Sequence, residues 1–187
     1  MTLLVDWQIK EAVQRGDLVI EPFEEEYLNP ASLDVRLGNE FGILELAEGK
    51  SMIIPSDKES YRTDTYILNA YVLPPGQFVL ACLIEKTGFG RTIAGQLIGK
   101  SSLARLGLMI HVTAGWADNG WVGRYTLELV NVGPHPILLQ TGMRIAQIKF
   151  FQTALPKEGY DKKKTSKYQN QSGMVGSLYW KNYESIE

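Results

Sequence analysis

Short apolar stretches separated by turn residues dominate the pattern of hydrophobic and polar positions along this chain. From position 66 onward the runs YILNAYVL, FVLACLIEK, LVNVG, ILLQTG and MRIAQIKFF follow one another, with glycine or proline between them. Earlier, residues 31–38 alternate as a strand does, with Leu33, Val35 and Leu37 on one face and Ser32, Asp34 and Arg36 on the other. Many short strands with such turns indicate an all-β sandwich or barrel rather than a parallel α/β sheet.

Two short helices are expected beside the strands. Residues 5–15 carry one apolar face, with Asp6 suited to cap the first turn and Gly16 suited to the exit. A second helical turn is expected to begin near Ser101, and Gly107 stops it within two turns. The predicted architecture is therefore mainly β, with one helix near the N-terminus and one short internal helix.

The strand pattern ends before the C-terminus. With 187 residues the chain is long enough for one domain with a proper core. Residues 1–155 carry the β pattern, whereas residues 156–187 are polar and Lys-rich, with too little apolar periodicity for a core element. We expect this second part to be a mobile arm of the same domain that becomes ordered on a ligand; a frayed terminus is the alternative.

Composition and charge exclude several classes of protein. A formal net charge of −2 argues against a general nucleic-acid binder. The single cysteine, Cys82, cannot form an internal disulfide, which suits a reducing compartment. The N-terminus lacks a basic region followed by an apolar run, and no segment approaches the roughly 18 apolar residues of a membrane span. We therefore expect a cytoplasmic protein.

Residues 100–128 contain the candidate chemistry. Lys100, Ser101, Ser102 and Arg105 place donors and positive charge at the expected helical turn, whose free N–H groups favour an anion. Ser101 and Arg105 are four residues apart and share a face, and a guanidinium suits phosphate oxygens. From these residues alone, an ordinary capped turn with a surface arginine is the alternative.

Two acids follow in the same segment. Glu128 interrupts an apolar strand, where a partly buried carboxylate would have the raised pKa of a general acid–base; a cross-strand ion pair is the alternative. Asp118 precedes Asn119-Gly120, a strong turn signal. A functional Asp118 would present its carboxylate to a sugar hydroxyl or a metal-bound phosphate, although most such aspartates bind only their own backbone.

Other chemistries lack their residues. A Walker A loop needs glycine where Ala94 stands. Zinc nucleobase deaminases need H-x-E followed by P-C-x-x-C, which one cysteine cannot supply. No GxSxG motif suggests a nucleophile. Any Mg²⁺ is expected to arrive with substrate phosphates rather than in a protein cage.

The segment KSSLARLGLMIHVTA resembles a hallmark of the dCTP deaminases of the dUTPase superfamily, in which it reads RSSLARLGLM-HVTA. The likeness runs almost end to end and includes ASLDVRLG, the GMRI strand and the tail SKYQNQSG. It implies a dUTPase-like distorted β-barrel or jelly roll that forms homotrimers, with active sites between subunits and a C-terminal arm that closes over the nucleotide. It also implies zinc-independent deamination of dCTP, Mg²⁺ bound with the triphosphate, and dTTP as a candidate inhibitor.

The resemblance assigns roles to individual residues. Glu128 matches the catalytic glutamate, which activates water for attack on cytosine C4 and passes the proton to the departing ammonia. Ser101 and Arg105 match residues that contact phosphate and help to set up the site, and Asp118 matches the residue that binds the deoxyribose 3′-OH. The other nucleotide-binding positions that it implies are Lys100, Ser102, Leu103, Ala104, Thr126, Leu127, Gln147, Tyr160, Lys167 and Gln171.

One departure bears on the products. Members that only deaminate tend to carry His-Arg after HVTA, whereas this chain has Gly115-Trp116 and in this respect resembles the bifunctional dCTP deaminase–dUTPases, as it does at Gln147. Those enzymes convert dCTP to dUMP and diphosphate without releasing dUTP. A deaminase that releases dUTP, a dUTPase alone and a non-catalytic nucleotide-binding regulator remain the alternatives.

Overall fold

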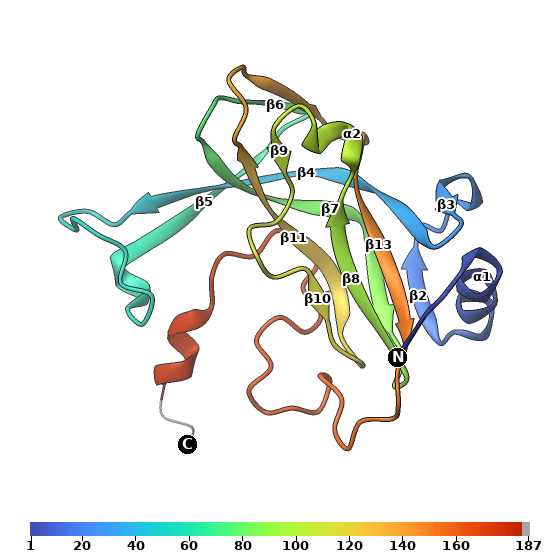
Figure 1. Ribbon diagram of the computed structural model, residues 1–187. Helices are drawn as coiled ribbons and strands as arrows, with labels where there is room; N and C mark the ends of the chain where they lie inside the picture. The colour runs from blue at the N-terminus through green and yellow to red at the C-terminus, as the bar shows by residue number, and fades with distance from the viewer. Residues whose placement is uncertain (185–187) are drawn as a thin grey trace.

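The structure, a computed structural model, describes residues 1–184. Antiparallel strands curl into a deeply bent sheet, and α1 packs at one side (Figure 1). The sheet order is β10-β8-β13-β4-β7-β11-β9, with β1, β2, β3 and β5 paired to its members and a separate β12-β6 pair. In chain order the elements are β1 (Thr2–Leu3), α1 (Asp6–Arg15), β2 (Leu18–Glu21), η1 (Glu25–Tyr27), β3 (Leu28–Asn29), β4 (Ser32–Leu46), η2 (Lys58–Ser60), β5 (Tyr61–Ile67), β6 (Ala70–Leu73), β7 (Phe78–Phe89), β8 (Ile93–Gly99), α2 (Ser101–Ala104), β9 (Leu108–Met109), β10 (Trp116–Ala117), β11 (Val122–Asn131), β12 (Ile137–Gln140), β13 (Arg144–Gln152) and η3 (Tyr179–Tyr183).

The mainly β architecture and the two short α-helices are confirmed. Gly16 ends α1 in the left-handed conformation at φ 76°, as expected. The predicted cap is wrong: Val5 occupies the N-cap, and Gln8 satisfies it by accepting the Val5 N–H at 3.1 Å. Asp6 lies inside the first turn and accepts the N–H of Trp7 at 2.8 Å. A glutamine that reaches back to the cap residue thus takes the place of a capping aspartate.

Strand β4 bridges the two halves of the sheet. It pairs with β13 near its start and with β7 and β5 further along. The expected apolar face, Leu33, Val35 and Leu37, is buried. The opposite face is not left to solvent, because Asp34 is only 3% exposed. A buried carboxylate needs partners, and these are described with the site.

Strand β11 shows the predicted alternation along its whole length. Tyr125, Leu127 and Leu129 are buried, while Thr126 and Glu128 are half-buried on the other face. Directly opposite, β7 places Leu80 across from Glu128. One side of β11 therefore contributes to the core, and the other side is available for chemistry.

The arm contributes no core strand but docks along β11. The Asn170 N–H donates to the Val122 carbonyl at 2.8 Å, and the Arg124 N–H donates to the Gln171 carbonyl at 2.9 Å. Val175 then donates its N–H to the Thr126 hydroxyl at 3.1 Å. The arm thus pairs with the edge of β11 near Gly123 and reaches the half-buried face at Thr126, and it occupies the lower part of Figure 1. Within residues 1–184 no helix is long and apolar enough to span a bilayer.

Candidate active site

A cavity of about 560 Å³ lies between β11, β7, the loop around β10 and the arm. This volume is within the range of small-molecule sites. Aromatic and aliphatic side chains supply much of its wall, with few polar groups among them. The predicted site residues that line it are Trp116, Asp118, Thr126, Glu128, Tyr160 and Gln171.

Glu128 projects from β11 into this cavity. Its Oε2 accepts the N–H of Val112 at 2.8 Å, and its own N–H donates to the Ile110 carbonyl at 3.1 Å. Phe78 and Leu80 line the cavity beside it. Within residues 1–184 no lysine, arginine or histidine lies at ion-pair distance from Glu128, so the cross-strand ion pair is wrong for the described chain. The carboxylate is held by one backbone donor and keeps its other oxygen for a ligand.

Asp118 and Trp116 form a second pair at the cavity wall. The Trp116 indole N–H donates to Asp118 Oδ1 at 3.1 Å, and the Trp116 ring packs on Phe151 with centroids 5.7 Å apart. The Asp118 carboxylate is therefore oriented by an indole rather than by its own turn. Both side chains remain substantially exposed, which leaves the second carboxylate oxygen free to bind a hydroxyl group.

Gly115 is required by close packing. Its carbonyl accepts the Leu97 N–H at 2.7 Å, where the loop before β10 meets β8. A Cβ at this position would lie inside the van der Waals contact distance of the Leu97 carbonyl oxygen and 3.2 Å from His111 Nε2. A larger residue here would therefore push the loop, and Trp116 with it, away from β8.

The arm closes one side of the cavity with its own internal bonds. The Tyr160 hydroxyl accepts the N–H groups of Lys167 and Tyr168 at 3.3 and 3.1 Å. The Trp121 indole donates to the Tyr168 carbonyl at 2.9 Å, and the Gln171 side chain donates to the Arg124 carbonyl. Lys167 lies on this loop but outside the cavity lining, so only part of the predicted arm set comes together here.

The rest of the predicted residues lie elsewhere. Helix α2 carries Ser101 and Ser102 on an exposed surface, Arg105 follows directly after it, and α2 lies at the opposite end of Figure 1 from the arm. Leu127 is fully buried in the core. None of the following predicted positions lines the cavity: Lys100, Ser101, Ser102, Leu103, Ala104, Arg105, Leu127, Gln147 and Lys167. One chain thus presents two separate groups of candidate residues.

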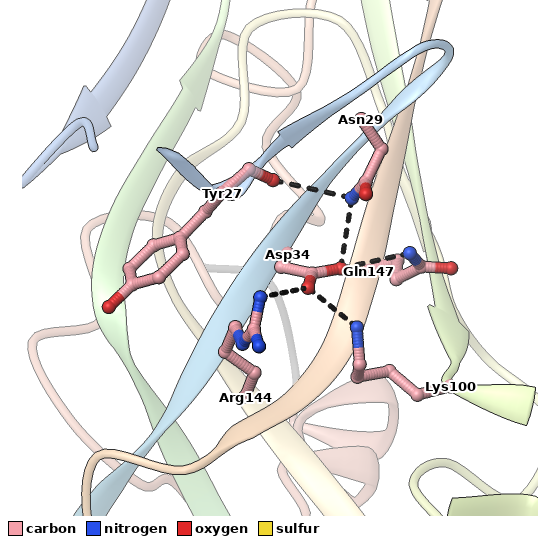
Figure 2. A network of polar contacts seen from close by, with 6 residues as sticks. All are labelled: Tyr27, Asn29, Asp34, Lys100, Arg144 and Gln147. Atoms are coloured by element: carbon pink, nitrogen blue, oxygen red, sulfur yellow. Dashed lines mark hydrogen bonds and ion pairs between the residues drawn. The ribbon is translucent and has the colours of Figure 1, made fainter. Parts of the chain in front are cut away.

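The second group includes an acid that the sequence reasoning missed. Figure 2 shows the Asp34 carboxylate surrounded by donors from separate segments. Oδ2 lies 2.6 Å from Lys100 Nζ and 3.4 Å from Arg144 Nη1, and Oδ1 accepts from Gln147 at 2.9 Å and Asn29 at 3.0 Å. Burial raises the pKa of Asp34, but the bonds from Lys100, Gln147 and Asn29 and the charge of Lys100 outweigh it and hold that pKa below its usual range. We name these five residues the Asp34 cluster.

Asp34→Asn is expected to destabilise the protein at neutral pH by about 1.5–3 kcal/mol, the range for hydrogen bonds to charged groups. Because the folded pKa of Asp34 is lowered, its stabilisation is complete above the unfolded value of about 3.9 and is lost as the pH falls through the folded value. The gap in thermal midpoint between wild type and variant should therefore narrow below about pH 4. Calorimetry from pH 7 to pH 3 measures this gap, and a constant gap would contradict the lowered pKa.

Comparison with known proteins gives one consistent family. The dCTP deaminase-like family model matches residues 3–153. A protein of Methanosphaerula palustris named dCTP deaminase, dUMP-forming, is 40% identical over 99% of this chain and 100% of its own length. A protein of the same name from Corynebacterium glutamicum is 41% identical over 97% of this chain and 98% of its own. The structure of a 2'-deoxycytidine 5'-triphosphate deaminase from Agrobacterium tumefaciens shares the fold, with a TM-score of 0.62 at 22% identity over 80% of this chain and 48% of that longer one.

Proposed function

This chain belongs to the dCTP deaminase-like family, and on that premise we propose that it converts dCTP and water to ammonia, diphosphate and dUMP. The observation that carries the proposal is Glu128, a half-buried carboxylate with one free oxygen in a cavity of about 560 Å³. The names of the full-length relatives favour the dUMP-forming reaction over release of dUTP, which is the second candidate.

In the deamination step, Glu128 takes a proton from water as the oxygen attacks cytosine C4. Ring N3 takes up this first proton, the C4–N bond then breaks, and the remaining hydroxyl proton passes through Glu128 to the leaving nitrogen, so that ammonia departs and a C4 carbonyl with a protonated N3 remains. The Val112 N–H, 2.8 Å from Oε2, fixes the carboxylate for both transfers. Phe78 and Leu80 exclude water from one side of the base.

Other cavity residues position the nucleotide. Asp118, oriented by the Trp116 indole at 3.1 Å, accepts the deoxyribose 3′-OH. Thr126 flanks the base on the cavity face of β11, while Leu127 packs in the core on the opposite face. The arm residues Tyr160 and Gln171, which line the cavity, enclose the triphosphate, and Lys167 lies on the same loop outside the lining.

The electrostatics of the cavity support an assembly of more than one chain. Within residues 1–184, its lining contains Asp118 and Glu128 but no lysine or arginine. A triphosphate carries several negative charges and needs cationic donors close by. We therefore propose that the exposed loop with Lys100, Ser101 and Arg105 completes the cavity of a neighbouring copy in a homotrimer.

Magnesium fits this arrangement as a companion of the substrate. Mg²⁺ keeps several waters and binds phosphate oxygens together with few protein groups. Within residues 1–184 no cluster of three or more His, Cys, Asp or Glu forms a cage for a metal. We place the ion on the triphosphate, where it would neutralise phosphate charge beside the two cavity acids. Inhibition by dTTP and a cytoplasmic location belong to the same proposal.

The test of the proposed function is product analysis of the purified protein with dCTP and Mg²⁺. Ammonia, diphosphate and dUMP should appear in equal amounts. A parallel incubation with dUTP should give dUMP and diphosphate. If dCTP yields no ammonia while dUTP is still hydrolysed, the protein is a dUTPase without deaminase activity.

Trp116→Arg is expected to shift the products from dUMP toward dUTP. The charged side chain would fill the space beside the phosphates and hinder the second water, while leaving Gly115 free for its close packing. A change of about tenfold in the dUTP to dUMP ratio corresponds to about 1.4 kcal/mol between the two transition states.

Chromatography of the nucleotides formed from dCTP measures this ratio. Trp116→Phe is the matched control, because it keeps an aromatic ring on Phe151 but loses the indole bond to Asp118. The control should slow turnover without releasing dUTP. An unchanged product ratio in Trp116→Arg would remove this residue as a determinant of the second reaction.

A further inference from the structure

The proposed reaction steps assign no role to Asp34, the buried acid at the centre of the Asp34 cluster. We propose that Asp34 is a positioning residue, which holds Lys100 and Gln147 as a preset pair of donors for the triphosphate of the nucleotide. This inference rests on the proposed function, because it concerns the phosphate half of the same site. Asp34 itself touches no substrate in this account; it acts through the two side chains that it binds.

Burial and geometry give the first support. The Asp34 side chain is 4% exposed, and four donors occupy its two oxygens. Gln147 lies directly opposite Asp34 in the pairing of β13 with β4, so the backbone register fixes their approach. A carboxylate that accepts from four donors cannot rotate freely, and it therefore restrains the side chains of Lys100 and Gln147 (Figure 2).

The remaining donors give the second support. The Lys100 ammonium donates one of its three N–H groups to Asp34, and the Gln147 amide donates one of its two. Both therefore keep donors for phosphate oxygens. Lys100 is also the residue directly before α2, so its fixed side chain anchors the start of the loop that carries Ser101 and Arg105.

Charge gives the third support. Asp34 contributes one negative charge, and Lys100 and Arg144 contribute two positive charges, which leaves the cluster net positive. The Arg144 side chain is 54% exposed and stacks over the Tyr27 ring at 5.7 Å. The acid thus holds two cations together that would otherwise repel each other, while the cluster as a whole still attracts an anion.

The experiment compares two ligands on Asp34→Asn, in the full-length protein. A non-hydrolysable dUTP analogue and dUMP are titrated by calorimetry against wild type and variant. Positioning predicts about tenfold weaker binding of the triphosphate, the loss of roughly one charge-assisted hydrogen bond, with dUMP changed less than about twofold. Simple charge attraction predicts the reverse, because removal of a carboxylate makes the cluster more positive. The sign of the change therefore separates the two explanations.

Glu85→Gln is the matched control. Glu85 is equally buried and pairs with Arg36 at 2.7 Å, but it makes no bond to Lys100 or Gln147 within the described chain. It should lower the thermal midpoint while leaving the ratio of the two affinities as in wild type. If Asp34→Asn fails to fold, Asn29→Ala takes its place, because Asn29 supports the same carboxylate at 3.0 Å, and a smaller selective loss is expected.

Unchanged or tighter triphosphate binding in a folded variant would overturn the positioning role. Equal weakening of both ligands would also overturn it, since that result describes a general structural defect. Ammonia release by the wild type decides the proposed function separately. A wild type that deaminates dCTP while the Asp34 variant keeps its triphosphate preference would refute only the role of Asp34.

Discussion

Replacing Glu128 by glutamine is expected to slow ammonia release from dCTP by about 10²–10⁴-fold, the usual contribution of a general acid–base. The amide keeps an oxygen that can accept the Val112 N–H, so the side chain should hold its position. It cannot take a proton from water or return one to the leaving nitrogen. Binding of the nucleotide should therefore persist while turnover is lost.

Timed assays of ammonia release measure turnover, and equilibrium titration with the nucleotide measures binding. Glu45→Gln provides the control, because Glu45 is an exposed acid on β4 outside the cavity lining. It should react at the wild-type rate. Near-normal ammonia release by Glu128→Gln would remove Glu128 from its role, and loss of binding together with turnover would indicate a structural effect.

Deletion of residues 157–187 is expected to weaken nucleotide binding by at least about tenfold, or 1.4 kcal/mol, while the proposed trimer persists. The deleted arm supplies Tyr160, Tyr168 and Gln171 to the cavity wall and covers β11 through its backbone bonds. Without it the triphosphate would lose both contacts and shelter from water.

A shorter deletion, of residues 179–187, is the control. It leaves the arm along β11 intact, because the bonds to Val122, Arg124 and Thr126 come from Asn170, Gln171 and Val175. Calorimetry should show weakened affinity after the longer deletion only, and light scattering should give three chains per assembly for all three proteins. Unchanged affinity after the longer deletion would show that the arm is not a lid.

Most of the fold that could be predicted from the sequence followed from the local periodicity of apolar residues. The alternation around Glu128 correctly separated the core face of β11 from the face toward the cavity, because a strand has a side-chain period of two. The N-terminal helix and its glycine exit followed from the same local rules. The prediction of its N-cap was wrong because Gln8, three residues after Val5, accepts the Val5 N–H, and Asp6 lies inside the helix.

Contacts between distant segments could not be predicted in this way. Asp34, Lys100 and Gln147 come together only because β13 pairs with both β4 and β8. The sequence placed Asp34 on the polar face of a strand, but periodicity does not say whether such a face meets solvent or another strand. Its position inside ASLDVRLG, a motif shared with the family, was the one available signal.

The candidate site was divided for the same reason. Residues 100–128 are continuous in sequence, and their chemistry was expected to converge. The fold instead places α2 on an exposed surface and Glu128 in the cavity, with strands β9 and β10 between them in the chain. Continuity in sequence therefore placed these candidate residues together, while only the fold shows that they form two separate groups, which under the proposed function a neighbouring copy would join.

The most direct test of the central claim follows a label through the coupled reaction. Dilute radiolabelled dCTP is incubated with the protein, Mg²⁺ and a large excess of unlabelled dUTP, and the labelled nucleotides are separated during the first few turnovers. Conversion of dCTP to dUMP within one site predicts that the label passes into dUMP without entering the dUTP pool. Accumulation of label in dUTP would contradict the account and identify a deaminase that releases its product.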